Sequence, residues 1–269
     1  MTGTECIRHR RSVRTFDGSV IDEAVLHRIL EFAQEVRNPY DIPISWKILD
    51  AKKDSLSSPV ITGTDKWITG KIAKVLHAEE AFGYSFEKVV LFAESLGLGT
   101  TWIGGTMDRQ AFEKAISLSE NEIMPCVSPL GYPAKKMSLR ESLMRKGVKA
   151  DSRLEFPELF FDGSFDKPIT EDTAGDLKAP FEMVRLGPSA VNKQPWRLVK
   201  CGSTVHFYEK RGIGSGRGEW DVQKIDIGIA MSHFEIATEE CGMNAIFFLG
   251  DPGLEVPDST SYIASYELK

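Results

Sequence analysis

Residues 187–199 read GPSAVNKQPWRLV and join a polar turn to the start of a strand. Pro188 fixes the backbone angle φ, and the hydroxyl of Ser189 can bond to nearby amides, so the chain is expected to turn here with free N–H groups. Pro195 should force Gln194 into an extended conformation, and alternating apolar residues follow. A helix end, a polar turn and a strand in succession favour a lip for a planar ligand with polar edges. An ordinary helix–turn–strand connection has the same pattern.

Length and composition exclude several classes of protein. With 269 residues, of which 42% are hydrophobic, the chain can bury a large core as one domain or as two closely packed halves. Its 33 basic and 39 acidic residues give a net charge of −6, which argues against nucleic acid and against a polybasic membrane patch as partners. No apolar run approaches the roughly 20 residues of a membrane span. The four cysteines lack CxxC spacing and the polar, basic start does not resemble a secretory signal, so we expect reduced thiols in the cytoplasm.

A second motif, HRRSVRTF, occupies residues 9–16. The alternation predicts an extended segment that buries Val13 and projects Arg10, Ser12 and Arg14 to one side. Because guanidinium groups match the geometry of oxyanions, these side chains are candidates for a phosphate clamp. A solvated basic face is the alternative.

Two further stretches carry glycine or positive charge where a ligand could lie. Residues 86–96 have the spacing of an amphipathic helix, which Gly97 can end with a positive φ. We expect a buried strand over residues 99–105, and its final glycines would let the backbone approach a ligand closely, although a tight turn also needs glycine. Residues 131–145, GYPAKKMSLRESLMR, follow a short strand and are basic, as either a phosphate site or a solvated face would be.

Two pairs of similar passages indicate an internal duplication. EFAQEVRNPYDIPISWKIL and FEMVRLGPSAVNKQPWRLV each contain a helix end, a turn with proline and a strand, and their tryptophans lie 150 positions apart. FAESLGLGTTWIGG and ATEECGMNAIFFLG align at a spacing of 145 between their helix-ending glycines. We therefore predict one repeat over residues 1–150 and a second over residues 151–269, forming one compact unit; chance similarity is the alternative.

The remaining segments follow from periodicity and turn residues. His233 is expected to be a satisfied core histidine, and the glycine-rich loop at 211–218 lacks the Lys-Ser/Thr of a phosphate-binding loop. The expected elements are helices at 4–9, from 22, at 72–76, 109–118 and 225–242, strands through 46–48 and 125–131, a hairpin over 196–210, an edge strand at 261–268, a loop at 52–70 and a connection over 150–176.

Together, the motifs at residues 9–16, 131–145 and 187–199 resemble those of the flavin-dependent nitroreductase family, whose turn pattern is PSSxNxQPWxF. The resemblance covers most of the chain and is greatest to the fused, two-repeat branch. It implies an α+β, nitroreductase-like fold with two pseudo-symmetric repeats, each a mainly antiparallel sheet packed by helices. In ordinary nitroreductases a homodimer makes two equivalent sites. Here the turn of the first repeat, NPYDIPISW, lacks the Ser, Asn and Gln of the pattern, so one site is expected in a monomer that acts as a pseudo-dimer.

The resemblance also implies a cofactor and an activity. FMN would be bound between the repeats, NADH or NADPH would donate hydride, and a small acceptor such as a nitroaromatic or a quinone would be reduced. No protein residue is expected to be catalytic, because the flavin carries the chemistry, and no metal site is expected. The residues implied to bind the cofactor are Arg10, Arg11, Ser12, Arg14, Ile103, Gly104, Gly105, Lys136, Arg140, Pro188, Ser189, Ala190, Asn192 and Gln194.

Three other functions are alternatives to this interpretation. A metal-dependent or nucleophilic hydrolase is disfavoured, because the histidines form no HExxH motif and no cysteine lies in a nucleophile signature. A non-catalytic flavin carrier or sensor would have its acceptor pocket closed by aromatic side chains such as Trp67, Trp102 or Phe82. A purely structural repeat would bind no cofactor.

Overall fold

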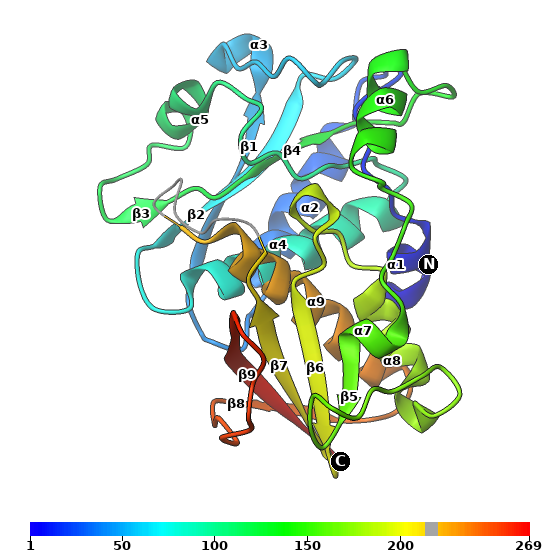
Figure 1. Cartoon of the computed structure of the whole chain (residues 1–269). Helices are drawn as coiled ribbons and strands as arrows, with labels where there is room; N and C mark the ends of the chain where they lie inside the picture. Colours follow the sequence, from blue (N-terminus) through cyan, green and yellow to red (C-terminus); the bar gives the residue numbers. More distant parts are fainter. Residues whose placement is uncertain (213–219) are drawn as a thin grey trace.

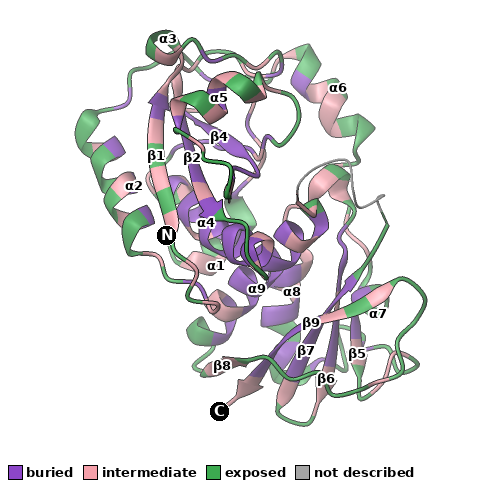
Figure 2. Cartoon of the chain, turned by 90° about the vertical axis from the view of Figure 1, so that its left-hand side faces the viewer, coloured by how far each residue is buried: buried purple, intermediate pink, exposed green. Residues whose placement is uncertain are grey.

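The computed structural model describes residues 1–212 and 220–269 (Figure 1). Two sheets lie on either side of a central pair of long helices, α4 (Ala78–Ser95) and α9 (Val222–Glu240). Figure 2 shows buried residues concentrated on these two helices and on the neighbouring strands. The fold is α+β, with mainly antiparallel sheets packed by helices, as predicted.

The first sheet is formed within residues 44–130. Strand β2 is its centre: it pairs antiparallel with β1 on one side and with β3 and β4 on the other. Apolar side chains of this sheet, of α4 and of α2 (Glu23–Glu35) form a common core. The strands are β1 (Ile44–Asp50), β2 (Lys66–Ala73), β3 (Glu122–Ile123) and β4 (Val127–Leu130).

The second sheet has the order β5-β6-β7-β9-β8. Its pairs are antiparallel except for β5 and β6, which are parallel. The C-terminal strand was expected at an edge, but that prediction is wrong, because the shorter strand β8 pairs with its outer side. The strands are β5 (Phe160–Asp162), β6 (Trp196–Cys201), β7 (Thr204–Lys210), β8 (Ala245–Phe248) and β9 (Thr260–Leu268).

Helices α2 and α9 each begin at an aspartate that caps the helix. Asp22 accepts a hydrogen bond from Ala24 N at the start of α2, and Asp221 accepts one from Gln223 N at the start of α9. The helices besides α4 and α9 are α1 (Gly3–His9), α2 (Glu23–Glu35), α3 (Ala51–Asp54), α5 (Arg109–Ala115), α6 (Leu139–Gly147), α7 (Phe156–Leu159), η1 (Gly175–Leu177), α8 (Lys178–Arg185) and η2 (Ala190–Asn192).

The contact between α4 and α9 shows the pseudo-twofold relation of the repeats. A Cβ atom on Gly83 would lie 2.0 Å from the carbonyl oxygen of Ile225, and one on Gly228 would lie 2.1 Å from that of Glu80. Gly228 lies 145 residues after Gly83, and Ile225 lies 145 residues after Glu80. Each glycine therefore packs against the residue that corresponds to the other glycine's neighbour, and the two contacts are equivalent. Reciprocity of this kind defines an isologous interface, here between two halves of one chain. The internal duplication predicted from the sequence is therefore present in the fold.

Several element predictions in the first half are wrong. The expected loop at 52–70 contains part of α3 and the start of β2, and residues 72–76 are not helical, because β2 continues to Ala73 in its hydrogen-bonded ladders. Helix α4 begins at Ala78 rather than near residue 86. Nearly all of its early residues are buried, so no polar stripe marks that turn of the helix in the sequence.

Three further parts of the chain depart from the expected backbone. Residues 99–105 make only isolated bridges, from Gly99 to Gly131, from Thr100 to Ser12 and from Ile103 to Val127, rather than a strand. The connection over 150–176 contains α7, β5 and η1, and its strand extends the second sheet. Gln194 has a φ of 49° and is not extended. The turn at this position overrides the usual preference for extended backbone before a proline.

Candidate functional site

A cavity of about 620 Å³ lies where the two repeats meet. Its volume is within the range of small-molecule and cofactor sites. Segments from both repeats form its walls: residues 10–14, 101–106, 125–126 and 144–145 from the first, and 148–153, 188–192 and 220–229 around the junction and in the second.

The N-terminal arginines reach the cavity because their segment is pinned against the core. Val13 is buried and donates its N–H to Thr100 O at 2.8 Å. Arg10 is 9% exposed, and its Nε lies 3.6 Å from Glu87 Oε1. Among the described residues, Nε and Nη1 of Arg10 and Nε of Arg14 find no hydrogen-bond partner. Unpartnered buried donors are costly, so these groups suit a ligand rich in oxygen atoms.

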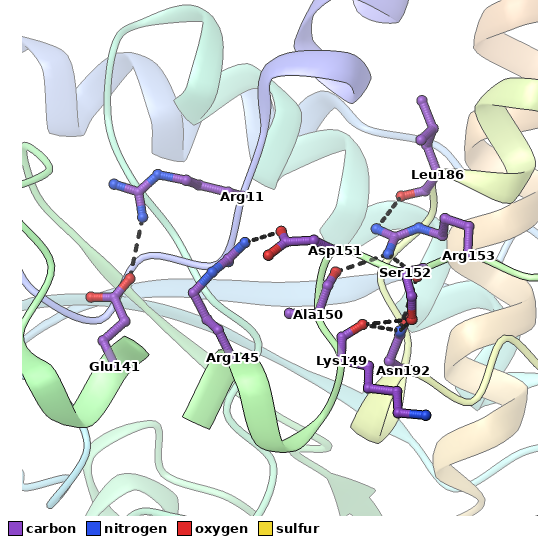
Figure 3. Close-up of polar contacts among 10 residues, drawn as sticks. All are labelled: Arg11, Glu141, Arg145, Lys149, Ala150, Asp151, Ser152, Arg153, Leu186 and Asn192. Carbon is purple, nitrogen blue, oxygen red and sulfur yellow. Dashed lines mark hydrogen bonds and ion pairs between the residues drawn. The ribbon is translucent and has the colours of Figure 1, made fainter. Parts of the chain in front are cut away.

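Two more arginines join this group. Arg153 donates to the carbonyl oxygens of Ala150, Ser152 and Leu186 at 2.9, 2.7 and 3.2 Å, while Arg145 pairs with Asp151 (Figure 3). Burial lowers the pKa of Arg153 from its usual value, and the neighbouring charge of Arg10 lowers it further. Cations that repel one another in a half-buried space favour an anionic ligand.

Arg11 also faces the cavity but is already paired. Its Nη1 lies 3.2 Å from Oε1 of Glu141, whose side chain is 1% exposed (Figure 3). Burial also lowers the pKa of Arg14, and the charge of Glu141 opposes that change. Glu141 thus offsets part of the positive charge at this end of the cavity.

The Gly104–Gly105 pair keeps part of the wall free of side chains. A Cβ on Gly105 would meet no described atom within 4 Å, and one on Gly104 would meet only Pro125 O at 3.7 Å. Arg109 holds this backbone from outside the cavity, with Nη2 2.6 Å from Gly104 O and its guanidinium carbon 4.6 Å from the ring centroid of Trp220. A planar ligand can therefore approach the peptide backbone here.

The 188–192 turn forms another part of the wall. Ala190 N donates to both carboxyl oxygens of Asp226. Figure 3 shows the second set of contacts, in which Asn192 Nδ2 donates to the carbonyl oxygens of Lys149 and Ser152 at 2.7 and 3.0 Å. Val191 and Asn192 have φ values of 43° and 58°. Such angles are uncommon outside glycine, above all for the β-branched Val191, and they are a frequent feature of ligand-binding turns.

The family follows from comparison of the whole chain. A family model described as "Putative TM nitroreductase" matches residues 3–238. The chain belongs to this nitroreductase family. No curated protein matches it.

Solved structures similar to this nitroreductase chain include a "putative nitroreductase" from Thermotoga maritima, with 20% identity, a TM-score of 0.64 and coverage of 100% of this chain and 93% of that one. A "putative NADH dehydrogenase/NAD(P)H nitroreductase" from Bacteroides thetaiotaomicron has 21% identity, covers 51% and 89% and has a TM-score of 0.43. An "FMN and NADPH-dependent nitroreductase" from a Sphingopyxis strain has 13% identity, covers 52% and 92% and has a TM-score of 0.44. The Thermotoga structure shows that the two chains share a fold.

Most residues that the sequence assigned to a nitroreductase cofactor meet at this cavity. Its lining includes Arg10, Arg11, Ser12, Arg14, Ile103, Gly104, Gly105, Pro188, Ser189, Ala190 and Asn192.

Three of the assigned residues lie away from the cavity. Gln194 is buried behind the turn, where its Oε1 accepts from Leu154 N at 2.9 Å. Arg140 is exposed and donates to Pro59 O, and Lys136 is exposed. On α6 the cation that reaches the cavity is Arg145, because one further turn and a half of helix carries its side chain inward.

Other lining residues of this nitroreductase were not assigned from the sequence. Arg153 lies in the segment interpreted as a connection, so only the fold reveals it. Trp102 and Trp220 also line the cavity. Asp226 had a usable signal: it is an acid between two isoleucines in an otherwise buried helix.

The remaining sequence predictions about the site are placed as follows. Of the aromatic residues expected to close an acceptor pocket, Trp102 lines the cavity, whereas Trp67 and Phe82 are buried in cores. His233 is a satisfied core histidine as predicted, with its ring nitrogens 2.8 Å from Met183 O and 3.0 Å from Glu87 Oε1. Most of the loop at 211–218 lies outside the described residues. Across residues 1–212 and 220–269, no cluster suits a metal ion and no helix is long and apolar enough to cross a membrane.

Proposed function

We propose that this nitroreductase family member is an FMN-dependent oxidoreductase, which takes hydride from NADH or NADPH and reduces a small acceptor such as a nitroaromatic or a quinone. The observation that carries the proposal is the meeting of unpartnered arginine N–H groups, of Arg10 and Arg14, with the bare backbone of Gly104–Gly105 in one cavity. The arginine N–H groups suit the oxygen atoms of a phosphate. The backbone without side chains at Gly104–Gly105 suits a flat ring system.

The residues present fit FMN. Guanidinium groups at residues 10, 14, 145 and 153 supply the charge that a phosphate needs, and the cavity volume of about 620 Å³ suits a cofactor. The glycine pair and the 188–192 turn form walls that a ring can contact from two sides. When bound, the flavin would supply hydride acceptance from the nicotinamide and electron transfer to the acceptor.

The chain's own groups would bind and orient. Arg10 and Arg14 would hold anionic oxygens, and their buried positive charge would favour negative charge that develops in the cavity. Trp102 and Trp220 would exclude water from its apolar part. Arg109 would hold the Gly104 carbonyl away from the ligand.

We propose a single site per chain, built from a repeat at 1–150 and one at 151–269, so that a monomer acts as a pseudo-dimer. Support comes from the lining, which takes residues from both repeats. A cytoplasmic location belongs to the same proposal and is supported by the free thiols of Cys6, Cys126, Cys201 and Cys241.

The absorbance spectrum tests the function directly. Purified protein would be incubated with FMN, desalted and then treated with NADH or NADPH without oxygen. Flavin retained near one per chain and bleached by the nicotinamide is expected. Retained flavin that neither nicotinamide bleaches would favour a carrier or sensor instead, and a colourless protein would refute flavin binding.

A further inference from the structure

Asp226 is a buried acid in the wall of the cavity. It lies on α9 between Ile225 and Ile227, both buried, and is itself 3% exposed. Its two carboxyl oxygens lie 3.1 and 3.0 Å from Ala190 N. Within residues 1–212 and 220–269, no lysine, arginine or histidine forms an ion pair with it. A carboxylate in such a place would lack the counter-charge that burial requires.

The surroundings favour the neutral carboxylic acid. Burial raises the pKa of Asp226 well above its ordinary value; the Ala190 N–H opposes this, and the charges of Asp221 and Glu209 raise the pKa further. Asp221 lies at the start of α9, Glu209 is on β7, and Cys126, which also lines the cavity, has its own pKa raised mainly by burial and in part by Asp226. These surroundings therefore favour the protonated acid, which can donate a proton, over the carboxylate.

We propose that Asp226 is a catalytic acid that protonates the acceptor in this cavity, an inference that rests on the proposed function. Reduction of a quinone to a hydroquinone requires a hydride and one proton. The hydride, with two electrons, comes from the reduced cofactor and originally from NADH or NADPH. The O–H bond of Asp226 breaks as an O–H bond forms on the quinone oxygen. The carboxylate that remains then recovers a proton from water.

A purely structural role explains Asp226 less well. Accepting one hydrogen bond from Ala190 N requires only an oxygen, which an asparagine amide would supply without the penalty of a buried ionisable group. The position of the acid at the ligand's wall is explained if the proton itself is used. Perturbed acids in clefts are common at sites of proton transfer.

The protonation state is tested first, without flavin. Infrared difference spectra between the wild-type protein and Asp226→Asn should show a protonated carboxyl band at pH 7 in the wild type that the variant lacks. Asp166→Asn, a change at an exposed acid, should leave that band in place. Absence of the band from the wild-type protein would overturn the proposal, whether or not flavin binds.

Acceptor choice then separates proton donation from structure. Flavin-loaded Asp226→Asn should reduce a benzoquinone about 10²-fold more slowly than the wild type, which is typical for loss of a general acid, and ferricyanide within about twofold, because ferricyanide takes an electron and no proton. Wild-type quinone reduction should fall as pH rises through the pKa of Asp226. Equal loss with both acceptors, or loss with neither, would overturn the acid role. Failure of the wild-type protein to retain flavin would instead overturn the proposed function, and the acid role with it.

Discussion

The turn at 38–42 and the turn at 188–192 occupy related places in the two repeats, each between a helix and a strand that contains a conspicuous tryptophan. In the first turn, Tyr40 stacks on His77 at 4.8 Å between ring centroids and meets the edge of Phe247 at 5.0 Å. The second turn lines the cavity instead.

This difference shows that the two related turns have different surroundings. At the spacing of 145 residues, His77 corresponds to Val222 and Phe247 to Trp102, and both of these counterparts line the cavity. Tyr40 therefore fills with its own ring the place where, on the other side, we propose that a cofactor ring lies. Asn38 completes the closed turn, because its side chain bonds to the backbone of Tyr40 and Ile42. The first turn therefore packs into core, whereas the second lines the cavity.

The comparison depends on the reciprocal glycine contacts, so the largest effect is expected from Gly228→Ala. The new methyl group would lie 2.1 Å from Glu80 O, and the helices would have to separate. We expect a loss of about 3 kcal/mol in the free energy of unfolding, measured by urea denaturation. Gly147→Ala, where a Cβ meets no described atom within 4 Å, is the matched control and should cost little. Similar stabilities for the two variants would contradict the close packing of the repeats.

Removal of the ring in the closed turn should cost less. Tyr40→Ala would leave a hole between His77 and Phe247 and should lower the free energy of unfolding by about 2 kcal/mol, because the ring is partly buried. Tyr40→Phe, which keeps the ring and loses only the contact of its hydroxyl with Met231 Sδ, should be close to the wild type. Flavin bound per chain should stay near one in both variants. A second equivalent of bound flavin in Tyr40→Ala would show that the Tyr40 ring alone prevents flavin from binding at the closed turn.

Arg14 should matter for the ligand more than for the fold. Arg14→Ala removes a guanidinium with an unpartnered buried N–H, and FMN should bind about tenfold more weakly in a fluorescence titration. Arg10→Ala should weaken FMN binding as well, and it should also destabilise the protein because Glu87 loses a partner. Arg8→Ala, at an exposed position on α1, is the control. Wild-type affinity in both cavity variants would refute the clamp.

Asn192→Ala tests the open turn with the smallest expected effect. Its amide binds the carbonyl oxygens of Lys149 and Ser152, so the variant should loosen the segment that carries Arg153. We expect FMN affinity to fall about threefold to fivefold, in line with the loss of neutral hydrogen bonds at a partly exposed site. Comparison with Asn244→Ala, at an exposed position directly before β8, would show whether the effect is specific to this turn. Unchanged affinity would argue against a site built from both repeats.

Local pattern predicted well the elements that have a local signal. The capping acid Asp22, the apolar stripe of α2, and the positive φ of Gly97 and Gly242 follow from short-range chemistry. Prediction failed where pairing between distant segments decides the structure. Strand β2 lies in a stretch rich in turn-forming residues and is held by β1 and β4, and α4 is buried on so many faces that its first turns have no amphipathic pattern.

The site divides in the same way. Arg10, Ser12 and Arg14 share one side because side chains alternate along an extended backbone. The amino-acid composition alone indicates Gly104–Gly105 and the 188–192 turn as candidate parts of a site. Lys136, Arg140 and Arg145 have similar local sequence, so nothing nearby shows which of them reaches the cavity. Arg153 lies in an irregular segment, and Asp226 is conspicuous only as an acid among isoleucines.

The sequence by itself therefore determined the family, the duplication and the residue types that suit an anionic, planar ligand, because these depend on motif, spacing and periodicity. Tertiary structure alone decided which turn opens and which is filled by Tyr40, which cations face inward and how deeply Asp226 is buried. Those properties depend on contacts between segments about 145 residues apart, where packing and the loss of water, rather than local preference, set the energy.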